Sequence, residues 1–309
     1  LFRILAENHI LFDVIENAAL AQGNTPKALE DYQLVILPDV RYLSDTVCSR
    51  LDAYVANGGK LLATGMTSTA DENGNPLNAI RLKAAGVKPV YKLQPHTRGT
   101  YFRIRPEDKK QLAVSDLYAL DIAYLDSDFL VCEPAGETES LLGFIPEAMY
   151  GPPEKCYYTK VTDIPGLLYS HFGQGRCAFF PWLIGSHYQR RSNHVQSLLV
   201  MGALEGLLGL DRSVVVEASP LVEVTRHADS DSRFEWVGLI NHTGQNGTAF
   251  HKPIPMSAIP LQLKTQRNVK SIRLLRAEKK LDFSAVRAGW IKCVVPELQR
   301  FEIVLCEYE

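Results

Sequence analysis

Two short apolar runs on either side of a helix-length segment constrain this chain more than any other feature. YQLVILPDV (residues 32–40) and KLLATG (60–65) have strand length and no alternation, as in strands covered on both faces. Between them, residues 43–59 offer Ser44 as a helix N-cap and end at Gly58 and Gly59. This order of strand, helix and strand predicts a parallel βαβ unit with a right-handed crossover, and therefore an α/β domain.

The neighbouring segments extend the α/β pattern. Residues 1–20 have the periodicity of an amphipathic helix, and residues 193–209 predict a strongly apolar helix that ends at Gly209 and packs on the sheet. The remaining expected elements are a helix at 78–87 ending at Gly86, strands near 88–93, 99–105 and 139–146, and a hairpin over 166–185 around the turn FGQGR.

After Leu210 the pattern changes to short alternating strands separated by turns such as NHTGQNG. We expect six to eight strands here, forming a small β-sandwich. The sequence therefore predicts two domains, an α/β domain over 1–211 and an all-β domain over 212–309.

The stretch GMTST (65–69) follows the second apolar strand, where α/β hydrolases and amidotransferases hold a nucleophile on a sharp turn. Its residues Gly65, Met66, Thr67 and Ser68 match neither G-x-S-x-G nor the equivalent cysteine turn. Thr67 or Ser68 would still need a base. His171, the one histidine expected at a strand end, lacks the His-x-Glu spacing of amidotransferases. We interpret the turn as a degenerate nucleophile turn.

The stretch HYQRRSNH (187–194) gathers cationic and aromatic side chains before the apolar helix. Cations at a helix N-terminus oppose the macrodipole unless an anion or acidic partner meets them. The segment is either a solvated loop with salt bridges or a contact for a carboxylate, a phosphate or a partner subunit. The candidate residues are His187, Tyr188, Arg190, Arg191 and His194.

Three other patterns favour ordinary structure over a site. Asp71, Asn73 and Asn75 resemble the start of a calcium loop, but Pro76 and Leu82 stand where an EF-hand needs Gly and Glu. The basic residues of 264–280 alternate with apolar ones, as on the outer face of a strand. Trp182, Trp236 and Trp290 lie in or beside expected strands, where core packing is favoured over stacking on carbohydrate.

Composition is that of an ordinary globular chain, with 46% apolar residues, 22% charged residues and a net charge of −2. It indicates neither nucleic acid nor a membrane as a partner, because no apolar run reaches the roughly 18 residues of a bilayer span. The six cysteines contain no C-x-x-C pair and several lie in apolar runs. We expect buried free thiols in a reducing compartment, the cytoplasm, and no metal site.

Residues 32–76 resemble the amidotransferase-like middle domain of family 42 β-galactosidases and related glycoside hydrolases, also called the β-galactosidase trimerisation domain. The matching features occur in one order, and a terminal β domain also fits the family. They are Leu37-Pro38, Leu43-Ser44-Asp45, Val55 to Gly59, Ala63-Thr64-Gly65, Asp71-Glu72-Asn73-Gly74, Phe172 to Arg176, Phe180-Pro181-Trp182 and the helix at His194.

The resemblance implies a flavodoxin-like, three-layer α/β domain of the class I glutamine amidotransferase type, followed by the β-sandwich. In this family the catalytic carboxylates lie on a barrel, which 309 residues in this pattern cannot contain. No catalytic residue and no cofactor is therefore expected here. The family's first parallel strand, expected before residues 2–20, is absent, and Leu1 stands inside a helical pattern, as in a chain cut from a longer one.

The function that follows is a noncatalytic oligomerisation and support region of a larger glycoside hydrolase. Its expected partners are an N-terminal barrel or neighbouring subunits in a homo-oligomer. Two alternatives stay open at the level of sequence: a stand-alone amidotransferase-like or esterase-like hydrolase that uses Thr67 or Ser68, and a carbohydrate-binding module that uses the tryptophans.

Overall fold

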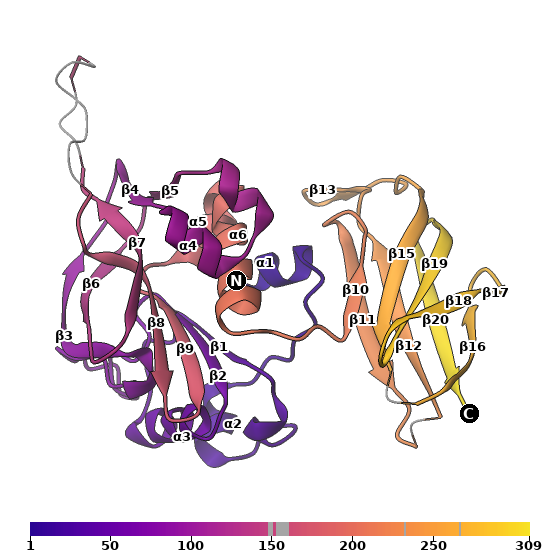
Figure 1. The fold of residues 1–309 in the computed structure, drawn as a ribbon, viewed down its shortest axis with the longest axis horizontal. Helices are drawn as coiled ribbons and strands as arrows, with labels where there is room; N and C mark the ends of the chain where they lie inside the picture. The colour runs from indigo at the N-terminus through magenta and orange to yellow at the C-terminus, as the bar shows by residue number, and fades with distance from the viewer. Residues whose placement is uncertain (148–150, 153–160, 232, 266) are drawn as a thin grey trace. The chain divides into compact units, whose positions relative to one another are not determined.

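The computed structural model describes residues 1–147, 151–152, 161–231, 233–265 and 267–309. The chain divides into two compact units. Figure 1 shows the chain coloured by residue number from the N-terminus to the C-terminus. The first contains Leu1 and Val14–Asp211, and the second contains Phe2–Asp13 and Arg212–Glu309. This division differs from the expected limits of 1–211 and 212–309 at residues 2–13.

The first unit combines one large sheet, one small sheet and several short helices. Its helices are α2 (Asn17–Gln22), α3 (Asp45–Ala56), α4 (Pro106–Leu112), α5 (Ile184–Arg191) and α6 (His194–Met201), with 3-10 turns η1 (Leu29–Asp31), η2 (Lys83–Ala85) and η3 (Ser115–Ala119) and the π-helical η5 (Gly202–Leu207). Its strands are β1 (Val35–Pro38), β2 (Lys60–Thr64), β3 (Val87–Gln94), β4 (Thr100–Arg103), β5 (Ile122–Leu125), β6 (Phe129–Pro134), β7 (Glu139–Ile145), β8 (Pro165–Phe172) and β9 (Gly175–Phe180).

The large sheet is mixed. It has seven strands in the order β1-β2-β9-β8-β7-β4-β5. Only β1, β2 and β9 pair in parallel, and each further pair is antiparallel. The fold is thus a mixed α/β fold, and the antiparallel half differs from the parallel sheet of a doubly wound domain. For β8 and β9 the reason is local, because the tight turn between them folds the chain back as a hairpin. The antiparallel pairs β7–β8, β4–β7 and β4–β5 do not follow from that turn.

The predicted βαβ unit is confirmed. Strands β1 and β2 pair in parallel with Leu37 opposite Ala63, and α3 connects them. The Ser44 hydroxyl caps α3 by accepting a hydrogen bond from the Val47 N–H at 3.3 Å. The buried side of α3 packs on the sheet because its apolar residues recur at helical spacing. The shared core includes Val47, Leu51 and Val55 of α3, Leu61 and Ala63 of β2, and Cys177 and Phe179 of β9.

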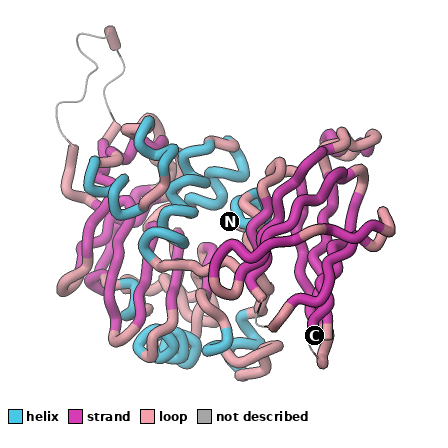
Figure 2. The backbone as a smooth tube through the Cα atoms, turned by 45° about the vertical axis from the view of Figure 1, so that its right-hand side comes forward, coloured by secondary structure: helices cyan, strands magenta, loops and turns pink. Residues whose placement is uncertain are grey.

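Helices and the small sheet cover both faces of the large sheet. On the face of α3, β6 adds Leu130 and Cys132 to the core, and β6 pairs with β3 in the small sheet. On the other face, the Tyr169 hydroxyl of β8 donates to the Leu207 carbonyl of η5 at 3.1 Å. Figures 1 and 2 show the helices of this unit in two groups, α2 with α3 and α4 with α5 and α6, on either side of the strands.

Three expected helices differ in the structure. Residues 1–20 form no continuous helix, because α1 (Phe2–Glu7) ends before His9, which has a left-handed φ of 56°, and α2 begins at Asn17. The segment 78–87 contains only the turn η2, although Gly86 does end it with a φ of 67°. The apolar helix predicted at 193–209 is present, but its second half is the π-helix η5.

The second unit is a two-sheet β-structure with α1 and the following residues joined to it. One sheet has the order β10-β15-β19-β18 and the other β11-β12-β20-β16-β17, all antiparallel. Their bounds are β10 (Val214–Val216), β11 (Val222–Ala228), β12 (Phe234–Asn241), β15 (Met256–Lys264), β16 (Val269–Leu274), β17 (Lys279–Leu281), β18 (Phe283–Arg287), β19 (Trp290–Leu298) and β20 (Phe301–Tyr308), with the small pair β13 (Gln245–Asn246) and β14 (Ala249–Phe250). The core includes Val237, Leu261, Cys293 and Val304, which alternate with outward residues along their strands.

Five cysteines lie in the cores as free thiols: Cys48, Cys132, Cys177, Cys293 and Cys306. Burial raises the pKa of each thiol, to about 11 for Cys48 and about 12 for Cys132. Cys156 lies outside the described residues. Among the helices that the structure describes, none is long and apolar enough to cross a bilayer.

Candidate functional site

The turn after β2 is sharp and tightly enclosed. Gly65 has a left-handed φ of 63°, and a Cβ placed there would lie 2.5 Å from Asp39 Oδ1 and 2.7 Å from Leu183 Cδ2. The Gly65 N–H donates to the Phe180 and Trp182 carbonyls, and the Met66 N–H donates to Asp39 Oδ1 at 2.7 Å. Only glycine satisfies both this conformation and this space.

The hydroxyls of Thr67 and Ser68 are buried and form hydrogen bonds with backbone groups. Thr67 Oγ1 donates to the Thr64 carbonyl at 2.7 Å and accepts from the Val40 N–H at 3.2 Å. Ser68 Oγ accepts from the Leu82 N–H at 3.2 Å. Both residues are at most 1% exposed. These contacts hold the turn against the loop after β1 and leave neither oxygen facing solvent.

The histidine considered as a base lies at the other end of the sheet. His171 of β8 pairs with Arg176 of β9, and Arg176 pairs with Lys60 at the start of β2. The turn follows the end of β2, four residues further, which is about 13 Å along a strand. The structure therefore does not bring His171 to Thr67 or Ser68.

The cationic segment is a helix, which corrects the expectation of a loop before a helix N-terminus. Residues Ile184–Arg191 form α5, and Arg190 and Arg191 lie in its last turn. Cations there interact favourably with the helix macrodipole. Ser192 has a left-handed φ of 50° and ends α5, and Asn193 then caps α6 by accepting from the Val195 N–H.

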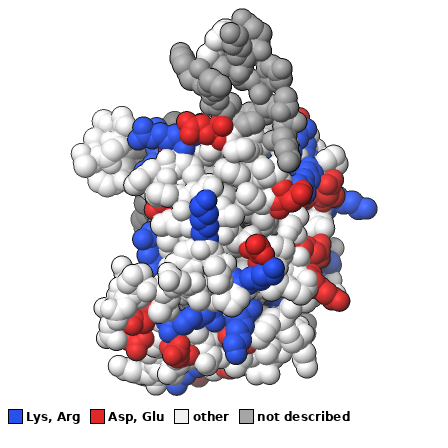
Figure 3. Space-filling model, turned by 90° about the vertical axis from the view of Figure 1, so that its left-hand side faces the viewer, with Lys and Arg blue, Asp and Glu red and all other residues white. Residues whose placement is uncertain are grey.

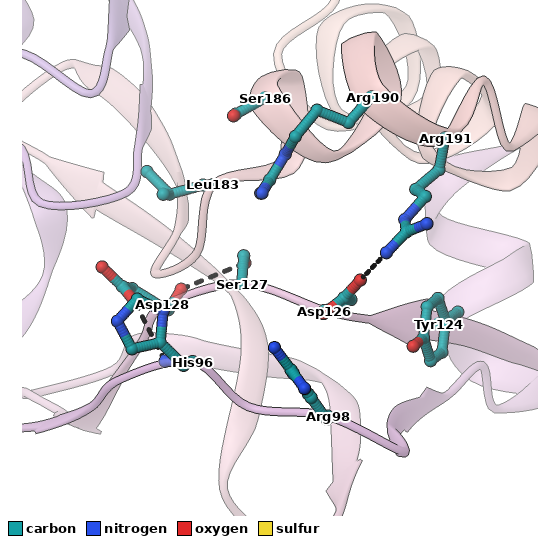
Figure 4. A pocket seen from close by; sticks show the side chains of 10 residues that line it. All are labelled: His96, Arg98, Tyr124, Asp126, Ser127, Asp128, Leu183, Ser186, Arg190 and Arg191. Carbon is teal, nitrogen blue, oxygen red and sulfur yellow. Dashed lines mark hydrogen bonds and ion pairs between the residues drawn. The ribbon is translucent and has the colours of Figure 1, made fainter.

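The two arginines line an open pocket of about 680 Å³ in the first unit (Figure 4). Three segments form it: the loop between β3 and β4, the end of β5 with the loop that follows, and α5 with the residue before it. The lining residues are His96, Arg98, Tyr124, Asp126, Ser127, Asp128, Leu183, Ser186, Arg190 and Arg191.

Hydrogen bonds between the two loops fix the floor of this pocket. Thr97 Oγ1 donates to the Ser127 carbonyl at 2.6 Å, and the His96 N–H donates to Asp128 Oδ1 at 3.0 Å. Across the pocket, Arg191 Nη2 lies 2.6 Å from Asp126 Oδ2. This hydrogen bond holds the pKa of Asp126 below its usual value. Asp126 is therefore ionised at neutral pH.

His187, one helical turn before Arg191, is completely buried and does not line the pocket. Its ring lies 5.5 Å from the ring of Tyr124 and 6.3 Å from that of Trp182. Neither ring nitrogen has a hydrogen-bond partner among the described residues. Burial lowers the pKa of His187, with Asp126 acting in the opposite direction. The imidazole is therefore neutral at neutral pH.

The structure thus brings together only part of the predicted cluster. Tyr188 is buried within α5, and His194 is exposed at the first position of α6. Sequence reasoning did not identify the residues that the two loops contribute: His96, Arg98, Asp126, Ser127 and Asp128. The stretch LDSDF (125–129), with two carboxylates directly after a strand, could have indicated a site. That these carboxylates lie beside α5 depends on the order of strands in the sheet, which the sequence does not show.

The other patterns have structural roles. The Asp71 carboxylate accepts from the N–H groups of Asn73 and Asn75 and from the Asn75 side chain, which closes a polar turn. Trp182 is fully buried with its Nε1 donating to the Gly166 carbonyl, and Trp290 is buried in β19. Among the described residues, no group of three or more His, Cys, Asp or Glu side chains is placed to hold a metal ion.

Charges on the visible face of the first unit are mixed in sign. Figure 3 shows Lys and Arg interspersed with Asp and Glu between uncharged areas. In the second unit, the basic segment 264–280 contains β16, where exposed Arg273 lies between buried Ile272 and Leu274. This is the alternation that the sequence predicted for the outer face of a strand.

Comparison with known proteins identifies the first part of the chain. Residues 2–81 match the sequence profile of the β-galactosidase trimerisation domain. The β-galactosidase BbgII of Bifidobacterium bifidum is 38% identical over 222 residues, which cover 70% of this chain and 28% of BbgII. The chain therefore spans less than a third of that relative.

Two solved structures share the fold over nearly the whole chain. The α-L-fucosidase isoenzyme 2 from Paenibacillus thiaminolyticus has a TM-score of 0.74 at 20% identity and covers 99% of this chain and 44% of its own. Gan42B, a GH42 β-galactosidase from G. stearothermophilus, has a TM-score of 0.62 at 16% identity and covers 100% of this chain and 35% of its own. The resemblance found in the sequence is thereby confirmed: residues 2–81 match the β-galactosidase trimerisation domain, and a β-galactosidase is similar in sequence over 70% of this chain.

Proposed function

We propose that this chain is a noncatalytic assembly and support region of a larger glycoside hydrolase that acts on β-galactosides. The observation that carries the proposal is the match of residues 2–81 to the trimerisation domain. The sugar class rests on the relative BbgII, a β-galactosidase, of which this chain spans 28%. The catalytic carboxylates of such an enzyme would lie in the part that this chain does not span.

The turn after β2 supports the noncatalytic assignment. An amidotransferase-like or esterase-like activity needs an exposed nucleophile and a nearby base. Here the Thr67 and Ser68 hydroxyls are buried and bonded to backbone groups, and His171 lies at the far end of the strands. The parallel part, β1, α3, β2 and β9, suits an amidotransferase-like domain in which the nucleophile turn has become a structural element.

Assembly is tested by sedimentation of the purified chain at concentrations from about 1 μM to 1 mM, the range over which weak and tight self-association separate. We expect a defined homo-oligomer. A monomer throughout this range would contradict self-assembly by this region.

Catalysis is tested with p-nitrophenyl β-D-galactoside and p-nitrophenyl acetate as substrates. We expect this chain to hydrolyse neither above background, and the Thr67→Val and Ser68→Ala variants to behave like the parent. An esterase activity that disappears in either variant, with folding retained, would contradict the noncatalytic assignment. The longer protein should hydrolyse the β-galactoside in preference to p-nitrophenyl α-L-fucoside.

A further inference from the structure

We propose that the pocket between α5 and the β3–β4 and β5–β6 loops binds the carboxylate or phosphate group of a small, hydroxyl-bearing anion. The inference goes beyond the proposed function, which assigns this chain no ligand. It rests on the arginines that face the pocket, on the fixed loops that form its floor, and on its size.

The charges of the pocket leave two guanidinium groups available. Asp126 pairs with Arg191 at 2.6 Å, and Asp128 accepts the His96 N–H at 3.0 Å. Within the described part of the chain, the side chains of Arg98 and Arg190 form neither a hydrogen bond nor an ion pair. Three arginines thus line the pocket with two carboxylates, which leaves an excess of positive charge. Asp126 forms an ion pair with Arg191, whereas Asp128 accepts a backbone N–H and lies 3.7 Å from the ring of His96.

Arg98 and Arg190 come from different elements and point into the same space. Arg98 extends from the loop before β4, Arg190 extends from α5, and Figure 4 shows their guanidinium groups directed at the pocket from opposite walls. Two like charges that face one space repel each other, and an anion between them removes this repulsion. The planar guanidinium fork suits the two oxygens of a carboxylate or phosphate.

The rest of the lining suits a ligand larger than a free ion. A volume of about 680 Å³ lies within the range that small organic ligands occupy. Ser127 and Ser186 offer hydroxyl groups, and Tyr124 and Leu183 offer apolar walls. Because Thr97 and His96 bond the two loops to each other, the floor is fixed before a ligand arrives.

The test is isothermal titration calorimetry of this chain with four probes at low ionic strength: inorganic phosphate, glucose 6-phosphate, glucuronate and uncharged glucose. We expect saturable binding of at least one of the two sugar anions with a dissociation constant of about 1 mM or below, and weaker binding of phosphate alone. Glucose should not bind in this range. The two sugar anions separate phosphate from carboxylate as the preferred group.

Substitutions connect the binding to the pocket. Arg98→Gln and Arg190→Gln should each weaken binding about tenfold, the value of one charge-assisted hydrogen bond. The double variant should show no measurable binding. Arg300→Gln is the matched control, because Arg300 is an exposed arginine of the second unit that does not line the pocket. Thermal unfolding should be the same for all variants.

Three results would overturn the proposal. The first is the absence of saturable heat with every anion. The second is binding that the double variant retains. The third is a change in the oligomeric state of the double variant without any ligand effect, which would assign the arginines to a contact between subunits. A tenfold rise in ionic strength should weaken a genuine anion complex in the parent chain.

Discussion

Gly65 shows how one residue fixes the geometry of the turn after β2. Its left-handed φ and the approach of Asp39 and Leu183 both exclude a side chain. The Thr67 and Ser68 hydroxyls that follow it are buried and bonded to backbone groups. At this scale the sequence was informative, because the missing cysteine or G-x-S-x-G serine is visible directly in GMTST.

Gly65→Ala should lower the free energy of unfolding by more than the roughly 1–3 kcal/mol of a strained backbone residue, because the new Cβ would also collide with Asp39. Urea denaturation measures the change. Gly136→Ala is the control, since Gly136 has a similar φ of 58° and no heavy atom within 4 Å of a Cβ placed there. Equal losses in the two variants would show that the enclosure of Gly65 adds nothing.

His187 should make the stability of the protein depend on pH. Burial lowers its pKa from the ordinary value of 6.5. Below about 6.5, the unfolded chain therefore binds a proton that the folded chain does not, so stability falls as the pH drops toward the folded pKa. His187→Leu removes this effect, and both ring nitrogens lack partners among the described residues, so little hydrogen bonding is lost.

The difference in unfolding free energy between parent and His187→Leu should therefore shift in favour of the variant from pH 7.5 to pH 5, by about 1.4 kcal/mol for each pKa unit of the shift. Urea denaturation at several pH values measures it. A difference that stays constant with pH would mean that the buried imidazole titrates normally.

At the scale of elements, a buried polar network links β11, β12 and β20. Glu235 is 3% exposed, forms a salt bridge with Arg226, and accepts a hydrogen bond from the Tyr308 hydroxyl. Arg226 also donates to the Lys264 carbonyl at 3.0 Å. Burial raises the pKa of Glu235, while Arg226 opposes the shift. The carboxylate thus depends on its partners.

Arg226→Leu should cost about 3–5 kcal/mol of stability at neutral pH because it leaves a buried carboxylate without its ion pair. The double variant Arg226→Leu, Glu235→Leu should recover most of this loss. The penalty of the single variant should decrease as the pH falls, since protonation removes the buried charge. A double-mutant cycle by urea denaturation measures the coupling, and a single-variant cost below about 1 kcal/mol would contradict a buried pair.

Elements were predicted well where the pattern is local. The βαβ unit, the β8–β9 hairpin and the strands near 88–93, 99–105 and 139–146 follow from apolar runs, caps and turn residues. The 78–87 segment was wrong as a helix because the N–H groups of Ile80 and Leu82 donate to the Pro89 carbonyl and to Ser68 Oγ, and only the turn η2 forms before Gly86. The antiparallel pairing of β7 with β4 and β8 was not predictable, since register between distant strands depends on packing rather than on local sequence.

At the scale of the whole molecule, the first residues belong to the unit that the last residues form. The ring nitrogens of His9 lie 3.1 Å from the Val216 carbonyl and 3.2 Å from the Ser219 carbonyl, and Arg212 donates to the Asn8 carbonyl. Leu11 packs against the core between the two sheets. The N-terminal segment therefore completes the β-structure, although about 200 residues separate the two in sequence.

Deletion of residues 1–13 should destabilise the second unit selectively. Hydrogen exchange followed by mass spectrometry should show faster exchange in β10 and β11, which lose these hydrogen bonds and this apolar cover. Strands β1, β2 and β9 of the first unit serve as the internal control and should keep their protection. Unchanged exchange in β10 and β11 would mean that residues 2–13 contribute nothing to that unit.

Local sequence by itself determined the βαβ unit, the change to β-structure after residue 210, the absence of a G-x-S-x-G or cysteine turn at GMTST and the family resemblance. Each of these depends on neighbouring residues or on a fixed order of motifs. Three features were decided by the tertiary structure alone. They are the unit that holds residues 2–13, the mixed strand directions of the large sheet, and the position of Arg98 and Arg190 in the lining of one pocket. Those features depend on contacts between segments far apart in the chain, and no local pattern specifies such contacts.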